Sequence, residues 1–168
     1  LDRLEISKSP ALAEDVYEVS AKLVNENAGD EAKRLMSYLT DIYGEYFLSG
    51  QYSDGMYSKD MACIWKENGN QYPAVLGLDL IEYTPSRVSH GSTSKAVEHA
   101  IEFWEKGGIV TFCWHWNAPE KYLKDPWYSG FYTEYTDIDL EKIMNGEDQE
   151  GYDLLMQDID AIAKQLLI

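Results

Sequence analysis

Three short apolar runs alternate with helical patterns along this chain, and this alternation restricts the folds open to it. The runs begin at about Phe47, Val75 and Ile109, roughly 30 residues apart. The second and third runs are almost continuously apolar, which is typical of strands buried on both faces. Buried strands that alternate with helices predict parallel βαβ units, so we expect an α/β fold.

Helical spacing of apolar residues fills the intervals between these runs. We expect four helices: from an N-cap at Asp30 to Gly44, from Ser58 to Asn68–Asn70, from a cap at Ser92 or Thr93 to Gly107–Gly108, and from Asp153 to the chain end. Residues 1–29 are mixed in character and predict an N-terminal arm or a short helix. Residues 30–168 carry the α/β pattern.

Two architectures fit this pattern, an open doubly wound sheet and a (β/α)8 barrel. No GxGxxG or P-loop motif follows any of the runs, which disfavours the nucleotide-binding form of the open sheet. Barrels carry their sites at the carboxyl ends of the strands, where this chain has polar or aromatic residues (49–51, 79–83 and 114–117). A barrel takes about 250 residues, so 168 residues with three strands predict only part of one.

The charge of the chain restricts its partners. The formal net charge of −16 disfavours nucleic acid and anionic membranes and suits a neutral ligand. The chain has no run of 18 apolar residues, so we expect no membrane span. No basic stretch followed by an apolar one starts at Leu1, so we expect no retained signal peptide. Cys63 and Cys113 form no CxxC pair, and we expect both to be buried free thiols. The three histidines lack the spacing of a ligand set, so we expect no metal and no cofactor.

His115 stands at the end of the third run. A strand period of two places Thr111, Cys113 and His115 on one face and Phe112, Trp114 and Trp116 on the other. Its position at a strand end favours contact with a ligand, and a core histidine with one hydrogen bond is the alternative.

Aromatic residues are dense after this strand. Aromatics make up 13% of the chain, and a dense block of them follows the strand: Trp114, Trp116, Trp127, Tyr128, Phe131, Tyr132 and Tyr135. Aromatic rings stack on the flat faces of sugars while polar side chains reach the hydroxyl groups. We expect Trp116 and Trp127 to contact a ligand and Trp114 to pack under a helix. A tyrosine-rich core and surface without any ligand is the alternative.

Asp79 and Glu82 are carboxylates at one strand end. Hydrolysis of a glycosidic bond needs two carboxyl groups. Residues three apart on a strand point to opposite faces, so at most one of these two lines a site. We expect Asp79 to be the site residue and Glu82 to lie in a loop or at the rim.

Four stretches together resemble glycoside hydrolase family 26, whose best-known members are β-1,4-mannanases: "YFLSGQY", "PAVLGLDLIEYTPSR", "GGIVTFCWHWNAP" and "GFYTEYTDIDL". The resemblance covers the chain from about Val24 onward. It implies a (β/α)8 TIM barrel, of which this chain supplies roughly the first three βα units. The rest of the barrel would be a further segment or chain. The resemblance also implies a retaining mechanism with two glutamates on the fourth and seventh strands, beyond this chain, so no catalytic residue is expected here.

The resemblance implies that His115 lies near the sugar at the cleavage point and that Asp79, Tyr83, Gln51 and Trp127 line the site. Trp116 and Asn117, on the rim of the third strand, complete the predicted substrate-binding set. The implied substrate is mannan or galactomannan, met outside the cell, so an extracellular enzyme is expected. The alternatives are the same chemistry on mixed-linkage β-glucan or xylan, a non-catalytic carbohydrate-binding protein, and an unrelated α/β domain with a structural His115.

Overall fold

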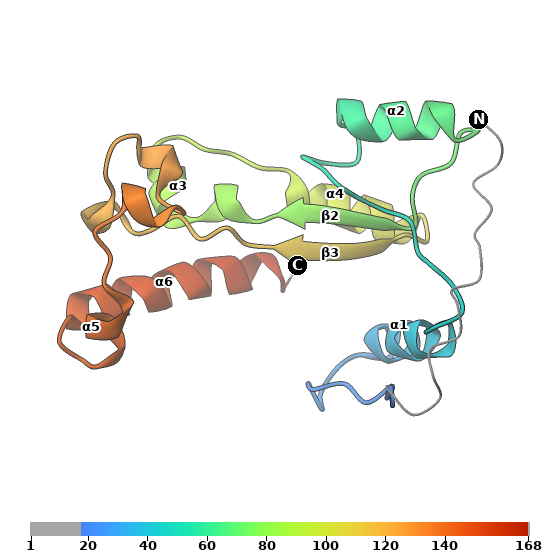
Figure 1. Ribbon diagram of the computed structural model, residues 1–168, viewed down its shortest axis with the longest axis horizontal. Helices are drawn as coiled ribbons and strands as arrows, with labels where there is room; N and C mark the ends of the chain where they lie inside the picture. The colour runs from blue at the N-terminus through green and yellow to red at the C-terminus, as the bar shows by residue number, and fades with distance from the viewer. Residues whose placement is uncertain (1–17, 168) are drawn as a thin grey trace. The chain divides into compact units, whose positions relative to one another are not determined.

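The computed structural model describes residues 18–167, which form two compact units divided between Leu48 and Ser49 (Figure 1). In the first unit, residues 18–29 contain no helix, and residues 1–17 of the predicted arm lie outside the described part. Helix α1 (Asp30–Asp41) follows. Its N-cap is Gly29 rather than the predicted Asp30, which lies in the first helical turn. The domain boundary at residue 30 stays a prediction.

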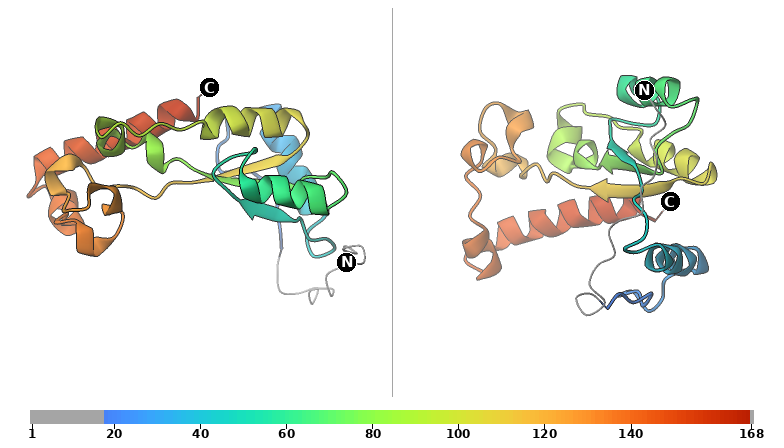
Figure 2. Two further views of the ribbon diagram at one scale, coloured as in Figure 1. Left: turned by 90° about the horizontal axis from the view of Figure 1, so that it is seen from above. Right: turned by 45° about the vertical axis from the view of Figure 1, so that its right-hand side comes forward.

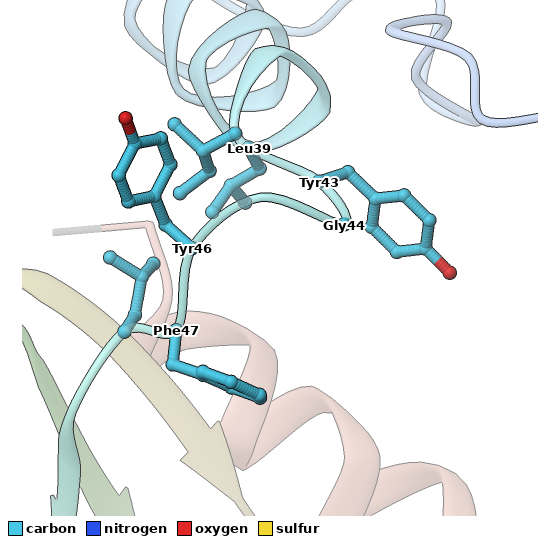
Figure 3. Close-up of a pocket in the computed structure, with 7 residues that line it drawn as sticks. Leu39, Tyr43, Gly44, Tyr46 and Phe47 are labelled. Atoms are coloured by element: carbon cyan, nitrogen blue, oxygen red, sulfur yellow. The ribbon is translucent and has the colours of Figure 1, made fainter. Parts of the chain in front are cut away.

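An apolar pocket lies at the end of the first unit (Figure 3). It is lined by residues from the last turn of α1 and from the segment that follows it: Leu39, Ile42, Tyr43, Gly44, Tyr46, Phe47 and Leu48. Gly44 has a φ of 77°, the left-handed conformation in which glycine ends helices at little cost. The hydroxyl groups of Tyr43 and Tyr46 point in opposite directions in Figure 3.

The second unit is built on a parallel three-stranded sheet in the order β1-β2-β3: β1 (Gly50–Tyr52), β2 (Val75–Asp79) and β3 (Ile109–Cys113). The predicted parallel βαβ units are therefore confirmed. The first strand begins at Gly50 and not at about Phe47, whose side chain is exposed. The strand starts later than predicted because pairing with β2 begins only where Gly50 lies opposite Val75.

Helices connect the strands and follow the last one: α2 (Lys59–Glu67), α3 (Pro85–Ser89), α4 (Ala96–Glu105), α5 (Leu140–Met144) and α6 (Gln149–Gln165). In the described part of the chain, four 3₁₀ turns lie in the loops: η1 (Ile81–Tyr83), η2 (Glu120–Tyr122), η3 (Trp127–Ser129) and η4 (Thr133–Tyr135). Within residues 18–167, no helix combines the length and the apolar character needed to cross a membrane.

Side-chain caps explain where these helices begin. Ser58 accepts the Met61 N–H and starts α2 as predicted. Helix α4 begins at Ala96, later than a cap at Ser92 or Thr93 predicts, because the Ser94 hydroxyl accepts the Ala96 N–H in a local turn. Helix α6 begins at Gln149, four residues earlier than expected, because the Asp148 carboxylate accepts the Gly151 N–H.

One face of the sheet is covered by helices. Alternate residues of β2 and of the segment after it, Leu76, Leu78 and Leu80, are almost completely buried. Leu76 and Leu78 pack with residues of α2, α4 and β3, which include Met61, Ala100, Phe103, Val110 and Phe112. Leu80 packs with Val97 of α4 and Ile162 of α6. The core of the second unit therefore lies between this face and the helices α2, α4 and α6.

The opposite face of the sheet, here called the open face, carries side chains that are partly or fully exposed within residues 18–167. The register aligns Tyr52, Gly77 and Thr111 across the three strands. Two residues further along β2 and β3, Asp79 lies opposite Cys113. Tyr52, Thr111 and Cys113 are exposed, whereas Phe112 and Trp114 pack on the helix-covered side. The predicted alternation of β3 is confirmed. Within the described residues both cysteines are exposed, in contrast to their predicted burial: Cys113 lies on the open face and Cys63 on the exposed side of α2.

The carboxyl ends of the strands point to one edge of the sheet. In Figure 1 the arrowheads of β2 and β3 point toward α3 and toward the orange turns of the segment after β3, and Figure 2 shows the same gathering from two other directions. Two segments meet at this edge, the post-β2 segment (residues 80–95) and the post-β3 segment (residues 114–139).

We predict that Leu78→Ala lowers the free energy of unfolding of the intact protein by about 2–5 kcal/mol, because it leaves a cavity in a tightly packed core. Urea unfolding measures this change. Val88→Ala in α3 is the control, since Val88 is 52% exposed and the loss there should stay within about 0.5 kcal/mol. Equal losses for both variants would contradict the assigned core.

Candidate functional site

The carboxylate of Asp79 lies at the carboxyl end of β2, on the open face, and accepts four hydrogen bonds. Its Oδ2 accepts from the Tyr52 hydroxyl at 2.9 Å and from His115 Nδ1 at 2.5 Å. Its Oδ1 accepts from the backbone N–H groups of Ile81 at 2.9 Å and of His115 at 3.2 Å. We call Tyr52, Asp79, Cys113 and His115 the Asp79 cluster. It joins the ends of all three strands.

Gly77 makes room for this arrangement. It lies opposite Tyr52 in the register, and a Cβ atom at position 77 would lie only 3.3 Å from Cδ2 of the Tyr52 ring. The glycine thus lets the ring lie against β2, and its hydroxyl group reaches Asp79, two residues further along the strand.

Hydrogen bonds keep Asp79 ionised. Burial by itself would raise the pKa of this carboxyl, but the hydrogen bonds from His115, Tyr52 and the backbone outweigh burial and lower its pKa. An ionised carboxylate only accepts hydrogen bonds, so His115 Nδ1 carries the proton between them. In a neutral imidazole ring, Nε2 is then an acceptor. The His115 side chain is 53% exposed within the described residues.

Cys113 completes the cluster. Its Sγ lies 3.9 Å from the Tyr52 hydroxyl and 3.8 Å from His115 Nδ1. Burial is the main cause that raises the pKa of the Cys113 thiol, and the Asp79 charge adds to it. Burial and the hydrogen bond to Asp79 raise the pKa of the Tyr52 hydroxyl as well. Both groups are therefore neutral at neutral pH.

Aromatic rings continue from His115 along the post-β3 segment. The ring of Phe131 meets that of His115 edge-on, with centroids 5.7 Å apart. Tyr132 packs on Phe131 at 4.1 Å, and Tyr135 follows at 6.3 Å. Phe131 and Tyr132 are exposed. Exposed rings beside a polar cluster are suited to the apolar faces and hydroxyl groups of sugars.

Of the seven predicted substrate-binding residues, the structure brings together Asp79 and His115. Gln51 lies in the middle of β1, where strand alternation turns it away from Tyr52, and its amide donates to the Tyr52 carbonyl. Tyr83 packs against the buried core on the helix-covered side. Its hydroxyl accepts the Val97 N–H at 3.4 Å.

Trp116 and Asn117 also lie away from the Asp79 cluster. The indole N–H of Trp116 donates to Asp158 of α6 at 2.7 Å, on the side of the helices. Asn117 is fully buried, and its amide donates to the Ser86 hydroxyl at 3.0 Å and to the Trp127 carbonyl at 3.2 Å. A side chain with no exposed surface cannot touch a ligand, so we correct the prediction for Asn117. Its hydrogen bonds join the post-β2 and post-β3 segments.

Trp127 stacks on His90 of the post-β2 segment, with centroids 4.3 Å apart and planes 4° from parallel. Arg87 lies 5.7 Å from the Trp127 ring centroid and donates to the Tyr128 carbonyl and to Glu82. One face of the indole is therefore already covered by protein. Glu82 pairs with Arg87 and takes no part in the Asp79 cluster.

Tyr52, Cys113 and Phe131 are site residues that the sequence did not single out. The strand period places Cys113 on the same face as His115, so the alternation along the sequence could have identified it. Tyr52 directly follows the predicted Gln51, and counting the strand face from Asp79 across the register would have favoured it. Phe131 belongs to the aromatic block but has no signal that separates it from its neighbours.

The family model of glycosyl hydrolase family 26 matches residues 24–167, and the chain belongs to this family. It is 39% identical over 168 residues to a mannan endo-1,4-beta-mannosidase of Thermothelomyces thermophilus, and the match covers 96% of this chain and 33% of that protein. It is 30% identical to mannan endo-1,4-beta-mannosidase A of a Piromyces species, covering 97% of this chain and 27% of that protein.

Solved structures show the fold. The GH26-CBM35 β-(1,4)-mannanase of Podospora anserina matches with a TM-score of 0.83 and 42% identity, over 94% of this chain and 35% of that one. The GH26 domain of a Prevotella bryantii protein matches with a TM-score of 0.71 and 23% identity, over 88% and 46%. The predicted fold is confirmed: the chain forms the first three βα units of a (β/α)8 barrel. It spans about a third of the length of the mannosidase of Thermothelomyces thermophilus.

We predict that Asp158→Asn changes how the stability of the intact protein depends on pH. Asp158 is 3% exposed, and burial raises its pKa above the ordinary 3.8 although the Trp116 N–H partly offsets this. A raised folded-state pKa means that stability from this group is complete below 3.8 and is lost as pH rises through the higher folded value. Asparagine keeps an acceptor for Trp116 and carries no charge.

The free energy of unfolding of the Asp158→Asn variant, relative to the parent, should therefore increase from acidic to neutral pH. Urea unfolding across this range measures the difference. Asp160→Asn on the exposed side of α6 is the matched control and should show no such trend. A relative stability of Asp158→Asn that stays constant with pH would rule out the buried charge.

Proposed function

We propose that the intact protein is an endo-acting glycoside hydrolase that cleaves β-1,4-mannan. Two lines of argument support this proposal. The relatives named above include mannan endo-1,4-beta-mannosidases of two genera. The open face of the sheet presents a fixed histidine beside exposed aromatic rings, an arrangement that suits a neutral polysaccharide.

The observation that carries the proposal is the hydrogen bond between Asp79 and His115. It holds the imidazole in one tautomer and orientation, so that Nε2 accepts a hydrogen bond from a sugar hydroxyl at the cleavage point. An acceptor held at one position distinguishes sugars that differ in a single hydroxyl group, because the wrong epimer leaves it unpaired. Phe131 beside His115 then packs on the apolar face of a sugar ring.

The groups that cut the glycosidic bond are proposed to be two glutamates beyond residue 168, acting with retention. Retaining hydrolysis uses two carboxyl groups about 5–5.5 Å apart, one of which acts as an acid. In the described part of the chain, the one carboxylate that hydrogen-bonds within the Asp79 cluster is Asp79 itself. Its carboxylate is ionised and already accepts four hydrogen bonds, so it is suited to positioning His115 and not to donating a proton. We therefore propose that these 168 residues alone hold the glycan but do not hydrolyse it.

The proposed partners follow from this function. The substrate is a β-linked mannan or galactomannan, which is met outside the cell, so we propose an extracellular enzyme. The remaining βα units of the barrel, as a further segment or chain, would close the sheet beyond β1 and β3.

We predict that the intact protein hydrolyses β-1,4-mannan with a higher kcat/KM than mixed-linkage β-glucan or xylan, and that mid-chain cleavage lowers viscosity before sugars of one or two units accumulate. Reducing-end assays on the three polysaccharides, together with viscometry, measure both. Proton NMR of the first products gives the anomer, which should be β. Faster turnover of glucan or xylan would reassign the substrate, and glycan binding without turnover would indicate a non-catalytic binding protein.

We predict that Asp79→Asn lowers kcat/KM on mannan roughly ten- to a hundredfold. Hydrogen bonds to charged groups contribute about 1.5–3 kcal/mol, and each 1.36 kcal/mol is a factor of ten in rate. The amide removes the charge that holds the Nδ1–H tautomer of His115. Asp160→Asn serves as the matched control and should leave kcat/KM unchanged. A thermal midpoint close to that of the parent shows that the loss is not unfolding, and unchanged kinetics in Asp79→Asn would refute the role of the pair.

A further inference from the structure

The Asp79 cluster combines three kinds of metal ligand. One carboxylate oxygen of Asp79, Sγ of Cys113 and one ring nitrogen of His115 all lie within 4.8 Å of one another. Within residues 18–167, this is the one set of three such groups that converges in this way. Carboxylate, thiolate and imidazole are all zinc ligands, and zinc sites of the open, catalytic type have three protein ligands and a water molecule.

We propose that Asp79, Cys113 and His115 bind one thiophilic divalent cation of the Zn²⁺ class, and that the bound cation blocks the glycan site. The blocking rests on the proposed function, whereas the binding does not. Cys113 decides the class of cation, because a thiolate selects Zn²⁺ and Cd²⁺ over the hard cations Mg²⁺ and Ca²⁺.

One of the two distances from His115 Nδ1 is close to that of a tetrahedral site, and the other is shorter. With metal–ligand bonds of about 2.0–2.3 Å, neighbouring oxygen, nitrogen and sulfur ligands lie about 3.3–3.6 Å apart. Cys113 Sγ and His115 Nδ1 are 3.8 Å apart. Asp79 Oδ2 and His115 Nδ1 are 2.5 Å apart, so this pair must separate by about 1 Å. His115 lies beyond the end of β3, so this separation leaves the strand pairing unchanged.

Binding exchanges protons for the cation. The Cys113 thiol releases one proton to solvent and coordinates as a thiolate. A neutral His115 ring moves its proton from Nδ1 to Nε2 and coordinates through Nδ1, with no net release. Asp79 gives up the hydrogen bond from His115 Nδ1 and keeps those from Tyr52, from Ile81 and from the His115 backbone.

The same exchange explains why the cation would inhibit. His115 Nε2, the acceptor proposed for the sugar hydroxyl, becomes an N–H donor. The cation and its water also occupy the open face beside Phe131. Both changes oppose glycan binding, so the cation and the glycan compete for one site.

The test uses the intact protein, freed of metals with EDTA, and ZnCl₂ or CdCl₂ as the probe. Calorimetry measures Zn²⁺ binding, and the ultraviolet charge-transfer band of a Cd²⁺–thiolate bond reports directly on the thiol. We expect one site that is lost, or weakened about tenfold or more, in Cys113→Ser. Cys63→Ser is the matched control, since Cys63 is also an exposed free thiol, and it should retain both signals.

A second variant and a folding measurement separate loss of the metal site from loss of the fold. Cys113→Ala repeats the test without a hydroxyl group, and circular dichroism shows whether each variant is folded. Unchanged binding in a folded Cys113 variant, loss of the Cd²⁺ band in Cys63→Ser, or no binding by the parent would each overturn the site.

The inhibition is tested separately. Zn²⁺ should raise KM for mannan without lowering kcat, EDTA should reverse the effect, and Cys113→Ser should reduce it about tenfold or more. Zn²⁺ bound through Cys113 without any effect on KM would overturn the blocking and leave the binding intact. If the intact protein did not hydrolyse mannan at all, the proposed function would fail, while the Cd²⁺ band would still decide the metal site.

Discussion

The organisation of the site depends on a single carboxylate shared by three strands. Asp79 accepts from Tyr52 of β1, from the backbone after β2 and from both the ring and the backbone of the residue after β3. Each of these donors is placed by the parallel register, and Gly77 leaves the space through which Tyr52 reaches the carboxylate. Burial of this charge is tolerated because all its partners are present at once. Loss of any one strand would leave the carboxylate incompletely paired.

The order of elements could be predicted from the sequence because it follows from local periodicity. Apolar runs gave β2 and β3 in parallel pairing, and a period of two separated Cys113 and His115 from Phe112 and Trp114. The inclusion of Tyr52 depends on register and on the absence of a side chain at Gly77. Neither is visible in the sequence around Tyr52, and the family resemblance implied its neighbour Gln51 instead.

The partners of the residues after β3 could not be predicted from local periodicity. Trp116 and Asn117 follow His115 directly, after the end of the strand. The period of two still gives the side on which Trp116 lies, that of Phe112 and Trp114, but it does not give the partners of either residue. Trp116 turns to the carboxylate of Asp158, 42 residues away, and Asn117 is buried by Ser86 and the Trp127 carbonyl. Partners this distant in sequence leave no local pattern. The residue types suited a sugar site, whereas long-range hydrogen bonds assigned them to the framework.

The contacts between the post-β2 and post-β3 segments have a consequence for how the rim of such a barrel can change. Ser86 with Asn117, Arg87 with the Tyr128 carbonyl, and His90 with Glu120 form bonds that cross from one segment to the other. An insertion or a loop exchange in one segment alone would break partners in the other. The two segments therefore have to change together. An exchange of the rim between relatives is expected to preserve these hydrogen bonds only when both segments are moved.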